Sequence, residues 1–148
     1  MTMKRTDVEF HSEGTLCRAW FYDPETSSPS PVIVLAHGLG GTREMRLDSF
    51  AERFCEAGYA CLVFDYRHFG ASDGVPRRLL SVARQRADWR AALRFAATLP
   101  GVHPNRVVAW GTSFSGGHVI VMGATEPGLA AVIAQCPFTD GMASALTN

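Results

Sequence analysis

The stretch Arg106–Gly123, RVVAWGTSFSGGHVIVMG, decides the fold because its hydrophobic pattern changes at one serine. Before Ser113, residues 107–110 form an apolar run that is too short for a helix and is bounded by turn residues, which predicts a strand covered on both faces. After Ser113, the apolar side chains within residues 119–122 have the spacing of a helix packed against a sheet. We therefore predict a strand, a tight turn and a helix, with Ser113 at the apex in an uncommon backbone conformation that exposes its hydroxyl.

The chain as a whole has the size and composition of one globular domain. It has 148 residues, of which 47% are hydrophobic and 19% charged, and its formal net charge is zero. We predict a single domain, 1–148, in which residues 1–30 form a hairpin and a loop. The lack of a charge excess argues against nucleic acid or an anionic membrane as a partner. Because no signal-peptide core and no run of ~18 apolar residues is present, we expect a cytoplasmic protein without a membrane span.

The cysteines occur singly, and no C-x-x-C pair is present. Three of the four lie within apolar patterns, so we interpret Cys17, Cys55, Cys61 and Cys136 as reduced, mostly buried thiols rather than metal ligands or a disulfide framework. Neither GxGxxG nor GxxxxGK[ST] occurs, which argues against a nucleotide site. We expect no metal and no cofactor.

Short apolar runs and helical patterns alternate along the rest of the chain. An alternating hairpin is predicted within residues 8–21, and buried strands are predicted at 32–36, 60–64 and 129–134. One helix presents an apolar face within residues 47–55 and ends at Gly58. A long helix is predicted from about Arg77 to Leu99, with one face made of Leu79, Val82, Ala83, Trp89, Leu93 and Ala96. A last helix is expected to begin within residues 142–148.

This alternation predicts an α/β fold with a mostly parallel sheet, helices on both faces and the antiparallel hairpin at one edge. In such sheets, ligands bind at the carboxyl ends of the strands. His37, Asp65 and Ser113 each follow a predicted strand directly. Three stretches that are distant in sequence are therefore expected to meet at one rim of the sheet.

Three motifs on that rim resemble those of the α/β-hydrolase family, whose nucleophile elbow has the pattern G-x-S-x-G. Residues 111–115 are GTSFS, so Gly111 and Ser113 match and Ser115 replaces the second glycine. Residues 37–41, HGLGG, are similar to the family's His-Gly oxyanion loop, and residues 65–74 are similar to its D-x-R-x-x-G-x-S-x-G stretch. The resemblance covers nearly the whole chain. The members of the family that the chain resembles are serine esterases, lipases and dienelactone hydrolases.

The resemblance implies a serine hydrolase that acts on small carboxylic esters, with thioesters and amides left open. Ser113 would attack the acyl carbon to form an acyl-enzyme, and the backbone amides of Leu39 and Phe114 would form the oxyanion hole. In this family the acid and the histidine base follow the nucleophile in sequence. Asp140 is the one candidate for the acid, and no histidine follows His118. His37 is interpreted as a structural part of its loop, and His118 is expected to face along its helix.

The missing base suggests that these 148 residues are the N-terminal part of an incomplete α/β-hydrolase fold. The predicted strand 129–134 is apolar on both faces and would form an open sheet edge, which invites pairing with another strand. A second copy or a complementing chain at this edge is therefore a candidate partner. Without the base, a non-catalytic protein that keeps the fold and binds a ligand or partner is the alternative function.

The long predicted helix is also rich in arginine. Asp88 is its one acidic residue, opposed by Arg77, Arg78, Arg84, Arg86, Arg90 and Arg94. We interpret these arginines as a solvated helix face, with a partner surface as the alternative.

Overall fold

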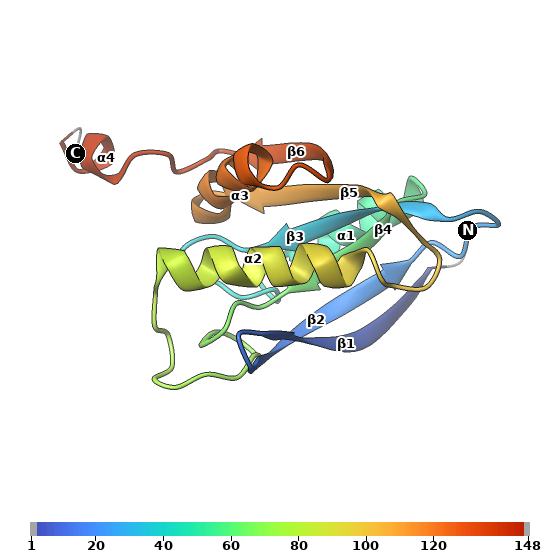
Figure 1. Ribbon diagram of the computed structural model, residues 1–148, viewed down its shortest axis with the longest axis horizontal. Helices are drawn as coiled ribbons and strands as arrows, with labels where there is room; N and C mark the ends of the chain where they lie inside the picture. Colours follow the sequence, from blue (N-terminus) through green and yellow to red (C-terminus); the bar gives the residue numbers. More distant parts are fainter. Residues whose placement is uncertain (1–2, 147–148) are drawn as a thin grey trace.

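The structure, a computed structural model, describes residues 3–146 and contains one mixed sheet with the strand order β1-β2-β4-β3-β5-β6 (Figure 1). The strands are β1 (Lys4–Ser12), β2 (Thr15–Asp23), β3 (Ser30–Ala36), β4 (Ala60–Phe64), β5 (Val102–Thr112) and β6 (Leu129–Gln135). β4, β3, β5 and β6 are mutually parallel, whereas the β1–β2 hairpin joins β4 in antiparallel pairing. The α/β fold with a mostly parallel sheet and an N-terminal edge hairpin is thus confirmed.

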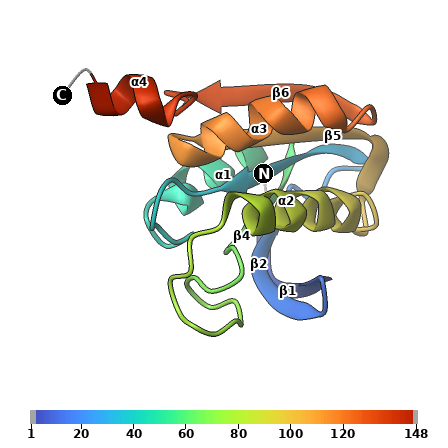
Figure 2. The same cartoon turned by 60° about the vertical axis from the view of Figure 1, so that its left-hand side comes forward.

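Helices cover both faces of the sheet, as predicted. The helices are α1 (Leu47–Glu56), α2 (Val82–Ala96), α3 (Phe114–Thr125) and α4 (Gly141–Leu146). Figure 1 shows α2 and α3 on one face and α1 on the other, and the view in Figure 2 agrees. One hydrophobic core accordingly contains Trp89 of α2 and Met122 of α3, and a second contains Leu47 and Ala51 of α1. Parallel strands buried on both faces explain why β3 and β4 are apolar runs without alternation.

The predicted long helix from Arg77 to Leu99 is wrong at both ends. Helix α2 begins after Ser81, whose side chain accepts a hydrogen bond from the Arg84 amide, and it ends at Ala96. Arg77 lies in the preceding loop, where its guanidinium donates to the carbonyls of Gly70, Ser72 and Gly74. These bonds anchor the loop, and helical periodicity gives no signal of them.

Two predicted helix faces also need correction. On α2, Trp89, Leu93 and Ala96 are buried, but Val82 is 41% exposed. On α3, Val119 and Met122 contact the core, whereas Ile120 is 44% exposed.

Asp88 does not oppose the arginines on the surface of α2. It is fully buried, and its carboxylate accepts hydrogen bonds from the backbone amide and guanidinium of Arg67. Asp88 therefore fixes the loop after β4 to α2 from the inside. Arg84 and Arg94 remain exposed on the helix.

The residues from β6 to the end of the described chain are more exposed to solvent than the rest of the sheet and its helices. Strand β6 forms the edge of the sheet, as predicted, and its residues are exposed or half-buried. Helix α4, which confirms the helix expected near the end of the chain, has no buried residue and projects beyond the body in both views (Figures 1 and 2). The prediction that most of the cysteines are buried is also confirmed, since Cys17, Cys55 and Cys61 are buried and Cys136 is exposed.

The fold depends on Gly111, and this dependence can be measured. A Cβ atom at residue 111 would lie 2.3 Å from the Ser115 carbonyl oxygen, so Gly111→Ala forces the backbone of β5 or α3 to move. We expect the free energy of unfolding to fall by about 3 kcal/mol in urea titrations. Gly128→Ala is the matched control, because no atom lies within 4 Å of its added Cβ. Equal stabilities of the two variants would contradict the assigned packing.

Candidate active site at the carboxyl ends of the strands

Ser113 occupies the turn between β5 and α3 in a conformation that side chains rarely adopt. Its backbone angles are φ 54° and ψ −114°, as the sequence predicted for the apex of a strained turn. The Ser113 amide donates to the Gln135 carbonyl at 3.0 Å, and its carbonyl accepts from the amides of Gly117 and Phe138. The residue is exposed. Backbone hydrogen bonds therefore hold the turn while the side chain stays accessible.

The glycine-rich loop after β3 lies against this serine. A Cβ atom added to Gly38 would be 3.1 Å from the Ser113 Cβ and 3.5 Å from its Oγ, so glycine is what allows the close approach. Leu39, the next residue, is 61% exposed. Phe114 opens α3, which places its amide at the positive end of the helix dipole. The structure thus brings the loop, Ser113 and the start of α3 together on one rim, as the sequence predicted.

Ser115, which departs from the G-x-S-x-G pattern, has a role that the sequence did not reveal. It is fully buried, and its hydroxyl donates to the His37 carbonyl. The same oxygen is hydrogen-bonded to the Tyr66 hydroxyl, which in turn accepts from Trp89 Nε1 at 2.7 Å. Because the His37 carbonyl can only accept, the donors run in order from Trp89 through Tyr66 and Ser115 to His37. This chain ties α2 and α3 to the loop at residues 37–41.

His37 and Asp65 serve the architecture of the rim, as expected. His37 is buried, its Nδ1 lies 2.9 Å from the Gly38 carbonyl oxygen, and burial lowers its pKa. Asp65 accepts hydrogen bonds from the amides of Arg43 at 2.8 Å and Ala71 at 3.0 Å. These bonds fasten the loops after β3 and β4 to each other. The Asp65 carboxylate also pairs with the Arg43 guanidinium at 3.3 Å, so it has a structural function on the rim.

His118 faces α2 rather than Ser113. Its Nε2 lies 2.8 Å from Gln85 Oε1, and burial, followed by the charge of Arg86, lowers its pKa from 6.5 to about 4. His118 is therefore neutral at pH 7 and donates from Nε2 to the amide oxygen. Within residues 3–146, no histidine forms a hydrogen bond with the Ser113 side chain.

Asp140, the candidate acid, caps the last helix. Its Oδ1 accepts hydrogen bonds from the backbone amides of Met142 at 2.9 Å and Ala143 at 3.0 Å. This is the standard arrangement of an aspartate at a helix N-terminus. Its carboxylate thus has a structural function at the start of α4.

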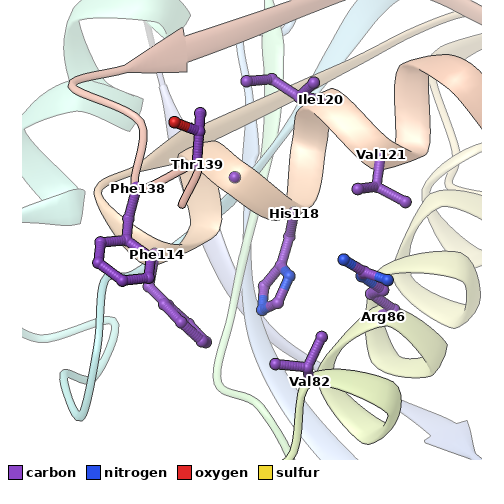
Figure 3. A pocket seen from close by; sticks show the side chains of 9 residues that line it. Val82, Arg86, Phe114, His118, Ile120, Val121, Phe138 and Thr139 are labelled. Atoms are coloured by element: carbon purple, nitrogen blue, oxygen red, sulfur yellow. The ribbon is translucent and has the colours of Figure 1, made fainter. Parts of the chain in front are cut away.

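An open pocket of about 260 Å³ lies beside the turn (Figure 3). Its wall includes Phe114 and His118 of α3, Arg86 of α2, and Phe138 in the segment after β6.

In the part of the chain that the structure describes, no group of three or more His, Cys, Asp or Glu side chains is placed to hold a metal ion. No helix within that part is both long and apolar enough to cross a membrane.

The sheet order, the strained serine and the loop packed against it define the α/β-hydrolase fold. Residues 13–148 match the profile of the X-Pro dipeptidyl-peptidase (S15) family, an α/β-hydrolase family, and the chain belongs to it. It is 58% identical over 140 residues to the quorum-quenching protein AidA of Acinetobacter baumannii, covering 95% of this chain and 46% of that protein. It is 31% identical to the thiohydrolase aneE of Aspergillus aculeatus, covering 91% of this chain and 42% of that one.

A solved structure agrees with these relationships. The α/β hydrolase GrgF from Penicillium superposes with a TM-score of 0.84 at 30% identity, covering 90% of this chain and 46% of GrgF. The chain thus spans about half the length of the relatives that it matches.

The low pKa of His118 has a consequence for stability. Between pH 6.5 and 4 the unfolded chain binds a proton at residue 118 more readily than the folded one, so stability falls as the solution is acidified. We expect His118 to account for a loss of about 3 kcal/mol in the free energy of unfolding over this range. His37 has a lowered pKa as well, so the quantity to measure is the difference in pH dependence between wild type and His118→Gln.

His11→Gln is the matched control for this measurement, because residue 11 is exposed on β1. It should keep the wild-type pH dependence, whereas His118→Gln should flatten it. Identical slopes for wild type and His118→Gln would contradict the assignment.

The hydrogen-bond chain through Ser115 predicts that its hydroxyl orders the glycine-rich loop. Ser115→Ala leaves the buried His37 carbonyl without its donor, which we expect to lower stability by about 2 kcal/mol and to speed amide hydrogen exchange within residues 37–41. Tyr66→Phe removes the other hydroxyl but leaves the bond from Ser115 to His37. It should therefore destabilise the protein with a smaller effect on loop exchange. Unchanged exchange in Ser115→Ala would show that the loop is held by other contacts.

Proposed function

We propose that the protein is a serine hydrolase that acts on carboxylic esters through an acyl-enzyme at Ser113. The observation that carries this proposal is the backbone of Ser113, at φ 54° and ψ −114°, with an exposed side chain beside the glycine-rich loop. A strained, hydrogen-bonded turn fixes a nucleophile in advance of reaction. Membership in an α/β-hydrolase family, with relatives named as hydrolases, supports the same class of reaction.

In this mechanism the backbone amides of Leu39 and Phe114 stabilise the negative charge of the tetrahedral intermediate. Phe114 is the first residue of α3, where amides lack partners within the helix, and Leu39 follows the glycine that touches Ser113. The hydrogen-bond chain through Ser115 supports this geometry by fixing His37, two residues before Leu39. Each such donor contributes roughly 3 kcal/mol to transition-state stabilisation.

The reaction also requires a base. The Ser113 oxygen attacks the acyl carbon and loses its proton to the base, the alcohol leaves with that proton, and water then hydrolyses the acyl-enzyme. None of the described histidines is hydrogen-bonded to the Ser113 side chain, and Asp140 caps α4. We therefore propose that the base, and an acid to orient it, come from polypeptide other than these 148 residues. The open edge at β6 is our proposed contact for that polypeptide, whether a complementing chain or a second copy.

Esters are the substrate class that we favour, with thioesters next. Relatives named thiohydrolases support the second class, because the same attack on an acyl carbon releases a thiol in place of an alcohol. The proposal includes no cofactor, and it places the protein in the cytoplasm.

One observation favours a second candidate function. Since no described histidine is hydrogen-bonded to Ser113, the chain is also suited to binding a ligand or partner without turnover. The two functions differ in one measurable property, the reactivity of the Ser113 hydroxyl.

Labelling with a fluorophosphonate probe, detected by intact mass, tests the proposal directly. Because the proposed base lies outside these residues, we expect one adduct to form slowly on the wild-type chain and none on Ser113→Ala, with Ser49→Ala on α1 as a control that labels like wild type. Added imidazole acts as a substitute base, so it should increase the labelling rate of wild type and leave Ser113→Ala unlabelled. A folded, monodisperse sample that acquires no adduct with or without imidazole would favour the non-catalytic function.

A further inference from the structure

The pocket beside the strained turn combines apolar walls with one unpaired positive charge. Val82 and Arg86, one helical turn apart on α2, form one wall. The facing walls come from α3 and from the segment after β6, and their apolar side chains are Phe114, Ile120, Val121 and Phe138. Figure 3 shows the Arg86 guanidinium in the gap between α2 and α3, on the side where Val121 and His118 lie.

Arg86 supplies a positive charge to the wall of this pocket, and the structure shows no acidic partner for it within residues 3–146. Its side chain is half-buried, and its Nε is shielded from solvent without a hydrogen-bond partner within residues 3–146. Arg90, on the next turn of the same helix, instead pairs with Glu126 at 2.7 Å. A guanidinium that is partly desolvated and unpaired gains most from an anion that can accept two parallel hydrogen bonds.

His118 limits the positive charge at this end of the pocket to that of Arg86. Its Nε2 is committed to Gln85, and it is neutral at pH 7, so it adds no second positive charge. A single guanidinium with a neutral neighbour suits a singly charged carboxylate better than a phosphate, for which several donors are usual.

The rest of the pocket suits an apolar body of limited size. The rings of Phe114 and Phe138 lie with centroids 5.7 Å apart, and the Phe114 and His118 rings are 4.9 Å apart. A volume of about 260 Å³ lies just below the usual range for ligand sites, so only a small ligand fits. The pocket is also directly connected to the turn, since Phe114 follows Ser113 and the Phe138 amide donates to the Ser113 carbonyl at 2.9 Å.

We propose that this pocket binds a small carboxylate with an apolar body, its charged group on Arg86 and its chain or ring against the side chains of Phe114 and Phe138. Because ester hydrolysis releases carboxylic acids, the pocket would retain an acid product or recognise an ester that carries a second, free carboxylate. That part of the inference rests on the proposed function. The binding itself requires no reaction at Ser113.

Hexanoate is the probe, and hexanamide is its neutral counterpart of nearly equal size. Titrations followed by amide chemical shifts and by calorimetry should show saturable binding of hexanoate, with shifts concentrated at Gly117, His118 and Phe138. Hexanamide should bind about tenfold more weakly, because it cannot form the charge-assisted hydrogen bonds. Ser113→Ala should bind hexanoate as wild type does, so that loss of Ser113 reactivity and loss of this site are separate results.

Arg86→Gln tests the charged residue, and Arg84→Gln removes an equal charge from an exposed position of the same helix. We expect about a tenfold weaker affinity for hexanoate in Arg86→Gln, less than a twofold change in Arg84→Gln, and wild-type circular dichroism in both. Equal affinity for acid and amide, an unchanged affinity in Arg86→Gln, shifts elsewhere on the chain or no saturable binding would each overturn the proposal. A change of oligomeric state in Arg86→Gln would assign the guanidinium to a protein interface instead.

Discussion

The close approach of β5 and α3 at Ser113 is the constraint on which the site depends. A strand that turns into a helix within one residue brings two backbones together, and Gly111 supplies the space because its missing side chain would collide with the Ser115 carbonyl. The positive φ of Ser113 costs on the order of 1–3 kcal/mol. Its amide and carbonyl hydrogen bonds to Gln135, Gly117 and Phe138 offset this strain. They involve both α3 and the segment around the end of β6, so the turn is stable only when the edge strand is in place.

Ser115 shows how the same constraint connects to the core. Its oxygen is placed between the His37 carbonyl and the Tyr66 hydroxyl, where a glycine would leave both groups buried with one partner fewer. The serine therefore supplies a donor to the His37 carbonyl and an acceptor to the Tyr66 hydroxyl, which gives the residue at this position of the family pattern a structural role. Trp89 completes the chain from α2, so the helix that covers the sheet also positions the loop on its rim.

Much of the fold could be predicted because parallel strands buried on both faces leave a simple signal in the sequence. The apolar run at 60–64 coincides with β4, and the change of period at Ser113 located the turn. The start of α2 was missed because the hydrogen bonds that hold Arg77 in the preceding loop have no periodic signal, although Ser81, which caps the helix, is a residue type that favours a helix start. The role of Ser115 was missed for a similar reason, since Tyr66 and Trp89 become its neighbours only after folding. Ile120 is exposed because of the rotation of α3 about its own axis on the sheet. The sequence of α3 does not specify this rotation, because its apolar residues are not confined to one face of the helix.

The two ends of the α3 surface near the turn have different electrostatic environments, and this difference follows from burial. On the side of the loop at 37–41, the His37 carbonyl accepts from Ser115 and the His37 Nδ1 lies near the Gly38 carbonyl, so we expect the backbone amides to be the donors for a developing negative charge. On the side of α2, His118 is held neutral by burial and by Arg86, and the Arg86 Nε has no hydrogen-bond partner within residues 3–146. Because His118 is neutral at pH 7, this side carries the single positive charge of the guanidinium. The uncompensated charge is therefore kept on Arg86, at the wall of a pocket that begins one residue after Ser113.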